Sequence, residues 1–144
     1  MHSDDDRLYE IAYAIHGIAR HLRPPTDLEP GLCTPVEITV MRHVHENPGS
    51  SAGSAAEATL LPSSNLSRIV RSLEAKGLLR RDVNTGDGRG VRLYPTPLAD
   101  ENQQKLRDAW SRSLRGILGD TASIDQLNTT LKLIEQALSA RRRG

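Results

Sequence analysis

The residues with the clearest chemistry in this chain lie between Pro62 and Gly77. Apolar residues recur there at steps of three and four, which predicts one face of an amphipathic helix. The opposite face carries short polar side chains followed by two arginines: Ser63, Ser64, Asn65, Ser67, Arg68 and Arg71. Serine and asparagine can hydrogen bond to base edges or phosphates, and arginine neutralises phosphate or reads guanine. The pattern is typical of a helix in a DNA major groove, and a solvated surface helix is the alternative.

The distribution of charge favours the first interpretation. The net charge of the 144 residues is only +1, but residues 1–62 hold four basic and nine acidic side chains. Residues 63–94 hold seven basic and three acidic side chains, and residues 95–144 hold eight and six. Positive charge therefore concentrates in and after the predicted helix, as a surface that contacts nucleic acid requires. A cleft that attracts an anionic ligand would fit this distribution less well.

Two helices are predicted directly before this one. Thr34 and Glu37 form a capping-box pattern around Pro35, which marks the start of a helix. The residues that this helix is expected to bury are Val36, Val40, Met41 and Val44. A short, alanine-rich helix is then expected over residues 51–59. Three helices in this order, the last two joined by a tight turn, predict a helix-turn-helix.

The residues after Gly77 predict a β-hairpin. Residues 78–83 and 91–94 have the composition of short strands, and the glycine-rich stretch between them supplies a turn. Pro95 cannot donate a backbone hydrogen bond, so the second strand is expected to be an edge strand or to end there. A basic hairpin after a helix-turn-helix is a wing.

Three charged residues of this hairpin are candidates for a role in DNA binding. We expect Arg89 to enter the minor groove, whose negative potential attracts arginine, and Asp87 to restrain the loop through an ion pair. Arg92 is a further candidate for a phosphate contact. The alternative for the turn is that it is only solvated.

Both ends of the chain predict helices with heptad-like apolar stripes. The first helix begins with a capping-box pattern at Ser3 and Asp6 and ends before Pro24. The last helix is expected to begin at a similar pattern at Ser123 and to end in arginines. Each stripe would expose apolar surface if it had no partner, so we expect the two regions to meet and to form a dimer.

The predicted fold is mainly α, of the α+β class: a winged helix-turn-helix with a two-stranded wing and dimerisation helices at both ends. Residues 34–96 form the DNA-binding region, and residues 1–33 and 97–144 form the helical dimerisation region. A single cysteine excludes an intrachain disulfide and indicates a reducing compartment. Without a signal-peptide pattern or an apolar run of membrane-spanning length, a cytoplasmic protein is expected.

At this point the sequence resembles the MarR family of winged helix-turn-helix regulators. The stretch from Ser67 to Arg81 resembles the recognition helix of that family running into its first wing strand. Asp87-Gly88-Arg89, followed by Thr96-Pro97, resembles its wing motif and the start of its dimerisation helix. The resemblance implies a homodimer that binds pseudo-palindromic DNA and is often released by small aromatic acids or by oxidation.

Two regulatory sites are candidates. Tyr9, Tyr13, His16 and Arg20 form a stripe on the first helix, and they could line a pocket for an aromatic carboxylate. The alternative is a half-exposed flank or a dimer contact. Cys33 precedes the cap of the next helix, where a helix N-terminus can favour a thiolate and hence a redox response. A buried structural thiol is the alternative.

No cofactor, metal site or catalytic residue is expected. His43 and His45 lie on different faces of one helix and cannot bind one metal together. The predicted function is a homodimeric, sequence-specific transcriptional regulator, a repressor released by a small aromatic or phenolic effector. Its two recognition helices would enter successive major grooves about 34 Å apart. The alternatives are a winged-helix protein-interaction module without a DNA operator and, more distantly, an enzyme that binds a small molecule.

Overall fold

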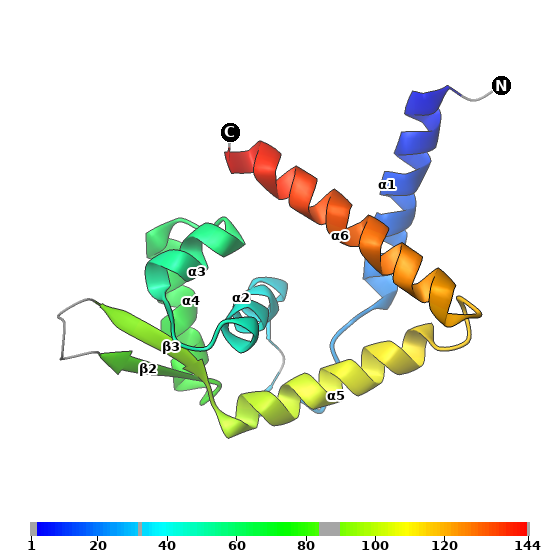
Figure 1. Cartoon of the computed structure of the whole chain (residues 1–144). Helices are drawn as coiled ribbons and strands as arrows, with labels where there is room; N and C mark the ends of the chain where they lie inside the picture. The colour runs from blue at the N-terminus through cyan, green and yellow to red at the C-terminus, as the bar shows by residue number, and fades with distance from the viewer. Residues whose placement is uncertain (1–2, 32, 84–89, 144) are drawn as a thin grey trace.

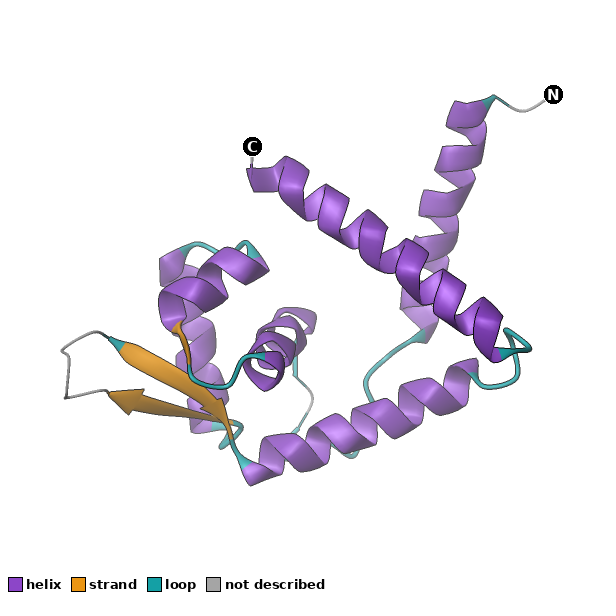
Figure 2. Ribbon diagram, viewed as in Figure 1, coloured by secondary structure: helices purple, strands orange, loops and turns teal. Residues whose placement is uncertain are grey.

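The computed structural model describes residues 3–31, 33–83 and 90–143. Its elements run in the order α1 (Asp4–His21), α2 (Pro35–Glu46), β1 (Ser50–Ser51), α3 (Ala52–Thr59), α4 (Ser63–Ala75), β2 (Leu79–Val83), β3 (Val91–Pro95), α5 (Pro97–Leu114) and α6 (Thr121–Arg143). The segment from α2 to β3 forms one module, and α5 leads away from it toward α1 and α6 (Figure 1). Helices dominate and the strands lie on one side of the module (Figure 2), so the predicted mainly α winged-helix class is confirmed.

The apolar faces of α2, α3 and α4 meet in a single core with the sheet. The largest fully buried side chains come from α2, α4, β2 and β3: Val40, Val44, Leu66, Leu73, Leu79 and Leu93. Ala55 of α3 is fully buried as well, and its small side chain allows α3 to pack closely on its neighbours. The prediction for α2 is wrong at Val36, which is 41% exposed because it lies in the first turn, ahead of the core.

The wing belongs to a three-stranded antiparallel sheet with the order β1-β3-β2. The two-residue strand β1 was not predicted, and it pairs Ser50 with Leu93. As a result β3 is the central strand, and the edge-strand alternative for it is wrong. The other alternative is confirmed, because Pro95 pairs with Leu79 at the end of β3 and the helix α5 follows.

Two of the three predicted capping boxes are confirmed, at Ser3 with Asp6 and at Thr34 with Glu37. The third is wrong, since α6 begins at Thr121, before Ser123. A carboxylate oxygen of Asp120 accepts the backbone N–H of Ser123 at 2.8 Å, so Asp120 caps this helix.

The loop between α1 and α2 is held along α5 by side chains of that helix. Lys105 Nζ donates to the carbonyl of Asp27 at 3.1 Å, and Trp110 Nε1 donates to that of Arg23 at 3.1 Å. The side chain of Asn102 donates to the carbonyl of Glu29 at 2.6 Å. The terminal helices and the winged module are therefore joined through the long helix α5 and this loop.

Candidate nucleic-acid interface

The helix α4 presents its polar residues to solvent because its apolar stripe is buried. Leu66, Val70 and Leu73 face the core. The exposed side chains are Ser63, Ser64, Ser67, Arg68 and Arg71. The predicted polar face is thus an exposed surface that spans about two helical turns, with both arginines on it.

The start of α4 has features that suit an anionic partner. Its N-cap is Pro62, which makes no side-chain capping bond, and its first turn contains no acidic residue. The first N–H groups of a helix without a cap remain available to acceptors, and the helix dipole adds positive potential there. Serine hydroxyls lie beside these N–H groups, so this end of α4 can donate several hydrogen bonds to one phosphate.

Asn65 differs from the other predicted contacts in being half-buried. Its Oδ1 accepts a hydrogen bond from Arg68 Nη2 at 2.8 Å. This bond restrains the long arginine side chain on the exposed face before any partner binds, which reduces the entropy lost on binding. Asn65 therefore orients Arg68 in the free chain.

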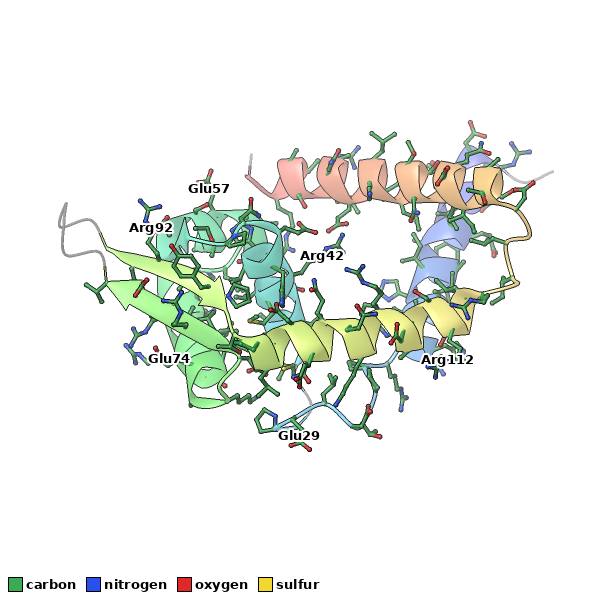
Figure 3. All side chains as sticks on the ribbon, turned by 60° about the horizontal axis from the view of Figure 1, so that its bottom comes forward. Glu29, Arg42, Glu57, Glu74, Arg92 and Arg112 are labelled. Atoms are coloured by element: carbon green, nitrogen blue, oxygen red, sulfur yellow. The ribbon has the colours of Figure 1, made fainter. Side chains whose placement is uncertain are left out.

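The wing contributes Arg92, which is exposed on β3. Its Nη1 donates to the carbonyl of Gly49 at 3.1 Å, and its cross-strand neighbour on β2 is Asp82. Figure 3 shows Arg92 on the winged module, at the other side from Glu74 of α4. The predicted contacts Asp87 and Arg89 lie outside the residues that the structure describes.

Two further arginines, Arg80 and Arg81, lie on β2 and were not predicted as site residues. Arg80 stacks over the ring of Tyr94, 4.6 Å from its centroid, and pairs with Asp82 at 2.9 Å. Arg81 Nε lies 3.1 Å from a carboxylate oxygen of Glu74 of α4, in a partly exposed pair of the kind that contributes at most about 1 kcal/mol. Only the consecutive basic residues signalled them, and cross-strand partners cannot be read from such a signal.

The buried carboxylate of Glu37 connects α2 to the end of α4. This residue is only 4% exposed. Its Oε1 accepts the backbone N–H of Thr34 at 2.9 Å, its Oε2 accepts the hydroxyl of Ser72 at 3.1 Å, and both oxygens lie 3.0 Å from Lys76 Nζ. Burial alone would raise the pKa of Glu37, but the bonds from Thr34, Lys76 and Ser72 together hold that pKa below its ordinary value.

This shift predicts how stability depends on pH. Because the pKa of Glu37 is lower in the folded chain, its stabilisation is present above the unfolded pKa and is lost as pH falls through the folded pKa. We expect Glu37→Gln to lower the free energy of unfolding by about 2 kcal/mol at pH 7, and we expect that difference to shrink below about pH 4.3. Urea denaturation from pH 7 to about pH 3 measures both quantities.

The control is Glu46→Gln. Glu46 forms an exposed pair with Arg42 on the same helix, 3.0 Å apart, and such pairs contribute at most about 0.5 kcal/mol. A difference between wild type and Glu37→Gln that stays constant down to about pH 3 contradicts the role given to the ionised carboxylate.

Cys33 is half-buried and packs against the core. Burial raises the pKa of its thiol, the carboxylate of Glu37 raises it further, and the ammonium group of Lys76 opposes the rise. The thiolate is therefore scarce near neutral pH, which favours the structural interpretation of this residue. A redox role stays a prediction.

We expect Cys33 to react with iodoacetamide at pH 7 about ten times more slowly in the folded chain than in urea, because burial limits both ionisation and access. Mass spectrometry of quenched samples gives the two rates. A folded-state rate equal to or above that of the unfolded chain would show that the thiol is activated.

The predicted effector residues lie together on α1. Tyr9 and Tyr13 pack with ring centroids 5.9 Å apart, and both are exposed, as are His16 and Arg20. These side chains do not line the cavity between α2 and α5. Their role as a binding site stays a prediction that would need a second chain to cover them.

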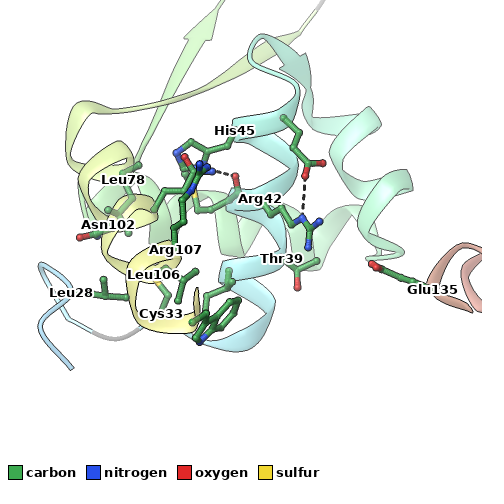
Figure 4. Close-up of a pocket in the computed structure, with 16 residues that line it drawn as sticks. Leu28, Cys33, Thr39, Arg42, His45, Leu78, Asn102, Leu106, Arg107 and Glu135 are labelled. Carbon is green, nitrogen blue, oxygen red and sulfur yellow. Dashed lines mark hydrogen bonds and ion pairs between the residues drawn. The ribbon is translucent and has the colours of Figure 1, made fainter. Parts of the chain in front are cut away.

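An open cavity of about 540 Å³ lies between α2, α5 and the loop before α2 (Figure 4). Its apolar lining includes Leu28, Met41, Leu106 and Trp110, and its polar lining includes His45, Asn102 and Arg107. Within the described part of the chain, the buried Oδ1 of Asn102 has no hydrogen-bond partner. A buried acceptor of this kind is satisfied by a ligand hydroxyl or a water molecule.

Solved structures similar to this chain are transcription regulators. A MarR family transcription regulator aligns with a TM-score of 0.71 and 19% identity, over 97% of this chain and 95% of its own. A MarR family protein from Bacillus stearothermophilus aligns with 0.69 and 17% over 96% and 99%, and the transcriptional regulator SlyA aligns with 0.66 and 21% over 94% and 96%. A comparison with curated proteins finds no significant match.

The family model described as MarR family matches residues 33–90, which run from before α2 to the start of β3. Over these residues, which form the winged module, the chain is similar to the MarR family. The predicted resemblance is therefore confirmed. MarR-family members are transcription regulators and not enzymes, in agreement with the prediction that this chain is not an enzyme.

The described residues show neither a metal-binding cluster nor a membrane-spanning helix. Among the described residues, no three His, Cys, Asp or Glu side chains gather closely enough to hold a metal ion. None of the helices that the structure describes is both long enough and apolar enough to cross a membrane.

Proposed function

We propose that this chain is a homodimeric regulator that binds a two-fold-related DNA operator through α4 and the wing. The observation that carries the proposal is the exposed face of α4, on which serines at an uncapped helix start are followed by Arg68 and Arg71. Short donors near the start of the helix suit base edges and phosphates, and arginines suit phosphate or guanine. The wing strand adds Arg92 on the same module.

The apolar stripes of the terminal helices support a dimer. Among the described residues α1 has none that are buried. The exposed apolar side chains of the two stripes are Leu8, Ile11, Ile15 and Ile18 on α1, and Ile124, Leu127, Leu131 and Leu138 on α6. Heptad-like stripes of this length are covered in helical dimers, so a second copy of the chain is the partner that we propose.

The experiment is a binding titration at several salt concentrations. The wild-type chain first enriches a duplex from a random pool of about 30 base pairs, long enough for two half-sites about 10 base pairs apart. Fluorescence anisotropy then gives its affinity. With about eight phosphate contacts in the dimer, log K falls against log salt with a slope of about −7, and two chains bind each duplex. A flat response, or no enriched duplex, supports the protein-interaction alternative.

The cavity between α2 and α5 favours an effector role. It adjoins both the winged module and α5, so a ligand there can alter how the two α4 helices of a dimer are spaced. Among the described residues Asn102 Oδ1 has no hydrogen-bond partner, so it can accept a hydrogen bond from a ligand hydroxyl. The guanidinium of Arg107 can pair with a ligand carboxylate, and Trp110 offers an aromatic surface. An aromatic hydroxy acid has all three features, and its binding would release DNA from a repressor.

Calorimetry with salicylate distinguishes this cavity from the stripe on α1. We expect Arg107→Ala to weaken salicylate binding by about tenfold, the loss of one charge-assisted hydrogen bond. Arg20→Ala is the matched substitution at the other candidate site. The cavity assignment fails if Arg20→Ala weakens binding and Arg107→Ala leaves it unchanged.

A further inference from the structure

We propose that Glu37 is a positioning residue for DNA recognition, because it fixes the angle of α4 on the winged module. This inference rests on the proposed function of α4. Glu37 lies in the first turn of α2 and contacts Ser72 and Lys76 at the C-terminal end of α4. Its hydrogen-bond partners are not among the residues proposed to contact DNA.

Glu37 joins two helices of the module, α2 and α4. Its two carboxylate oxygens hold the start of α2 through the N–H of Thr34, and they hold the last turn of α4 through Ser72 and Lys76. Ser72 and Lys76 are four residues apart, so both side chains reach the same carboxylate from successive turns. The sequence separations of 35 and 39 residues make this a tertiary contact and not a local cap.

Directional bonds add a constraint that the core contacts of α4 do not supply. Apolar packing is roughly proportional to area and tolerates small rotations, whereas hydrogen bonds weaken steeply with angle. α4 has 13 residues and is about 20 Å long, so a rotation of about 5° at its C-terminal end moves its N-terminal end by about 1.7 Å. A displacement of that size breaks a hydrogen bond to a base edge.

The sign of the electrostatic effect makes the proposal testable. Removing a negative charge beside α4 strengthens the attraction to phosphates, so charge alone predicts tighter DNA binding by Glu37→Gln. If Glu37→Gln instead displaces α4, we expect this variant to bind the duplex that the wild-type chain enriches more weakly. Glutamine can still serve in a capping box, so this substitution spares the contact to Thr34 and removes the charge that holds Lys76.

The control is Glu74→Gln, which removes the same charge from α4 itself. Glu74 pairs with Arg81 in a partly exposed contact at 3.1 Å, outside the network of Glu37. The probes are the duplex that the wild-type chain enriches and an unrelated duplex of equal length, titrated by anisotropy. Thermal melting of each variant establishes that it is folded at the assay temperature.

We expect Glu37→Gln to lower the ratio of specific to non-specific affinity about tenfold, and Glu74→Gln to keep the ratio within about twofold of wild type. Hydrogen exchange is the second measurement. We expect the protection of the backbone amides of residues 72–76 to fall in Glu37→Gln and not in Glu74→Gln. An unchanged ratio, or unchanged exchange, in folded Glu37→Gln overturns the proposal. If the wild type enriches no duplex, the proposed function fails, and exchange alone decides whether Glu37 holds α4.

Discussion

Replacing Leu131 by aspartate is expected to convert the proposed dimer into monomers and to weaken binding of the selected duplex by about 100-fold or more. Leu131 lies in the middle of the apolar stripe of α6 and is 42% exposed in the single chain. A carboxylate there would be buried against apolar side chains of a second copy, which is strongly unfavourable. Without a linked partner, the second α4 loses the high effective concentration that makes two half-sites bind together.

Analytical ultracentrifugation and anisotropy measure the two consequences of Leu131→Asp. Thr129→Asp is the matched control, because Thr129 is exposed on the other side of α6 and its hydroxyl donates to the carbonyl of Asp125 in the same helix. A dimeric Leu131→Asp chain that binds the duplex as well as Thr129→Asp would show that this stripe is not the dimer contact.

The second large effect is expected from Arg68→Ala, with a loss of affinity for the selected duplex of about 5- to 150-fold. One well-placed bidentate contact from arginine contributes about 1–3 kcal/mol of discrimination, and this range follows from it. The side chain is exposed and already oriented by Asn65, so its removal also loses a pre-organised contact.

Arg112→Ala is the control for Arg68→Ala, since it removes the same charge at the far end of α5 (Figure 3). Anisotropy at one salt concentration compares the two variants. If Arg68→Ala and Arg112→Ala bind the duplex with equal affinity, Arg68 acts only through net charge. The proposal that Arg68 contacts a base would then be wrong.

The parts of the fold that depend on local patterns could be predicted from the sequence. The face of α4 follows from its helical spacing, and the start of α2 follows from Thr34 and Glu37, whose side chains bond within one turn. The start of α6 shows the limit of such signals. Asp120 and Ser123 both suit an N-cap, and only the backbone geometry decides that Asp120 fills that position.

Contacts between distant residues could not be predicted. The strand β1 has two residues and exists only because Ser50 meets Leu93, 43 positions later. That pairing makes β3 the central strand, although Pro95 at its end had suggested an edge strand. A two-residue strand carries no periodic signal in the sequence.

The site was predicted in part for the same reason. The polar residues of α4 follow from periodicity, but the role of Glu37 depends on Ser72 and Lys76, and the cavity depends on side chains from segments that are far apart in the sequence. The predicted effector stripe on α1 is exposed in the single chain, whereas Asn102 and Arg107 of α5 line the cavity. Periodicity identifies which residues share a helix face, and only tertiary packing identifies which faces enclose a cavity.

The central claim is that two copies of this chain insert their α4 helices into successive major grooves. Hydroxyl-radical and methylation-protection footprinting of the selected duplex tests it most directly. We expect two protected major-groove segments on one face of the duplex, related by two-fold symmetry and centred about 10 base pairs apart. A single protected segment, or protection that is uniform along the duplex, would contradict it.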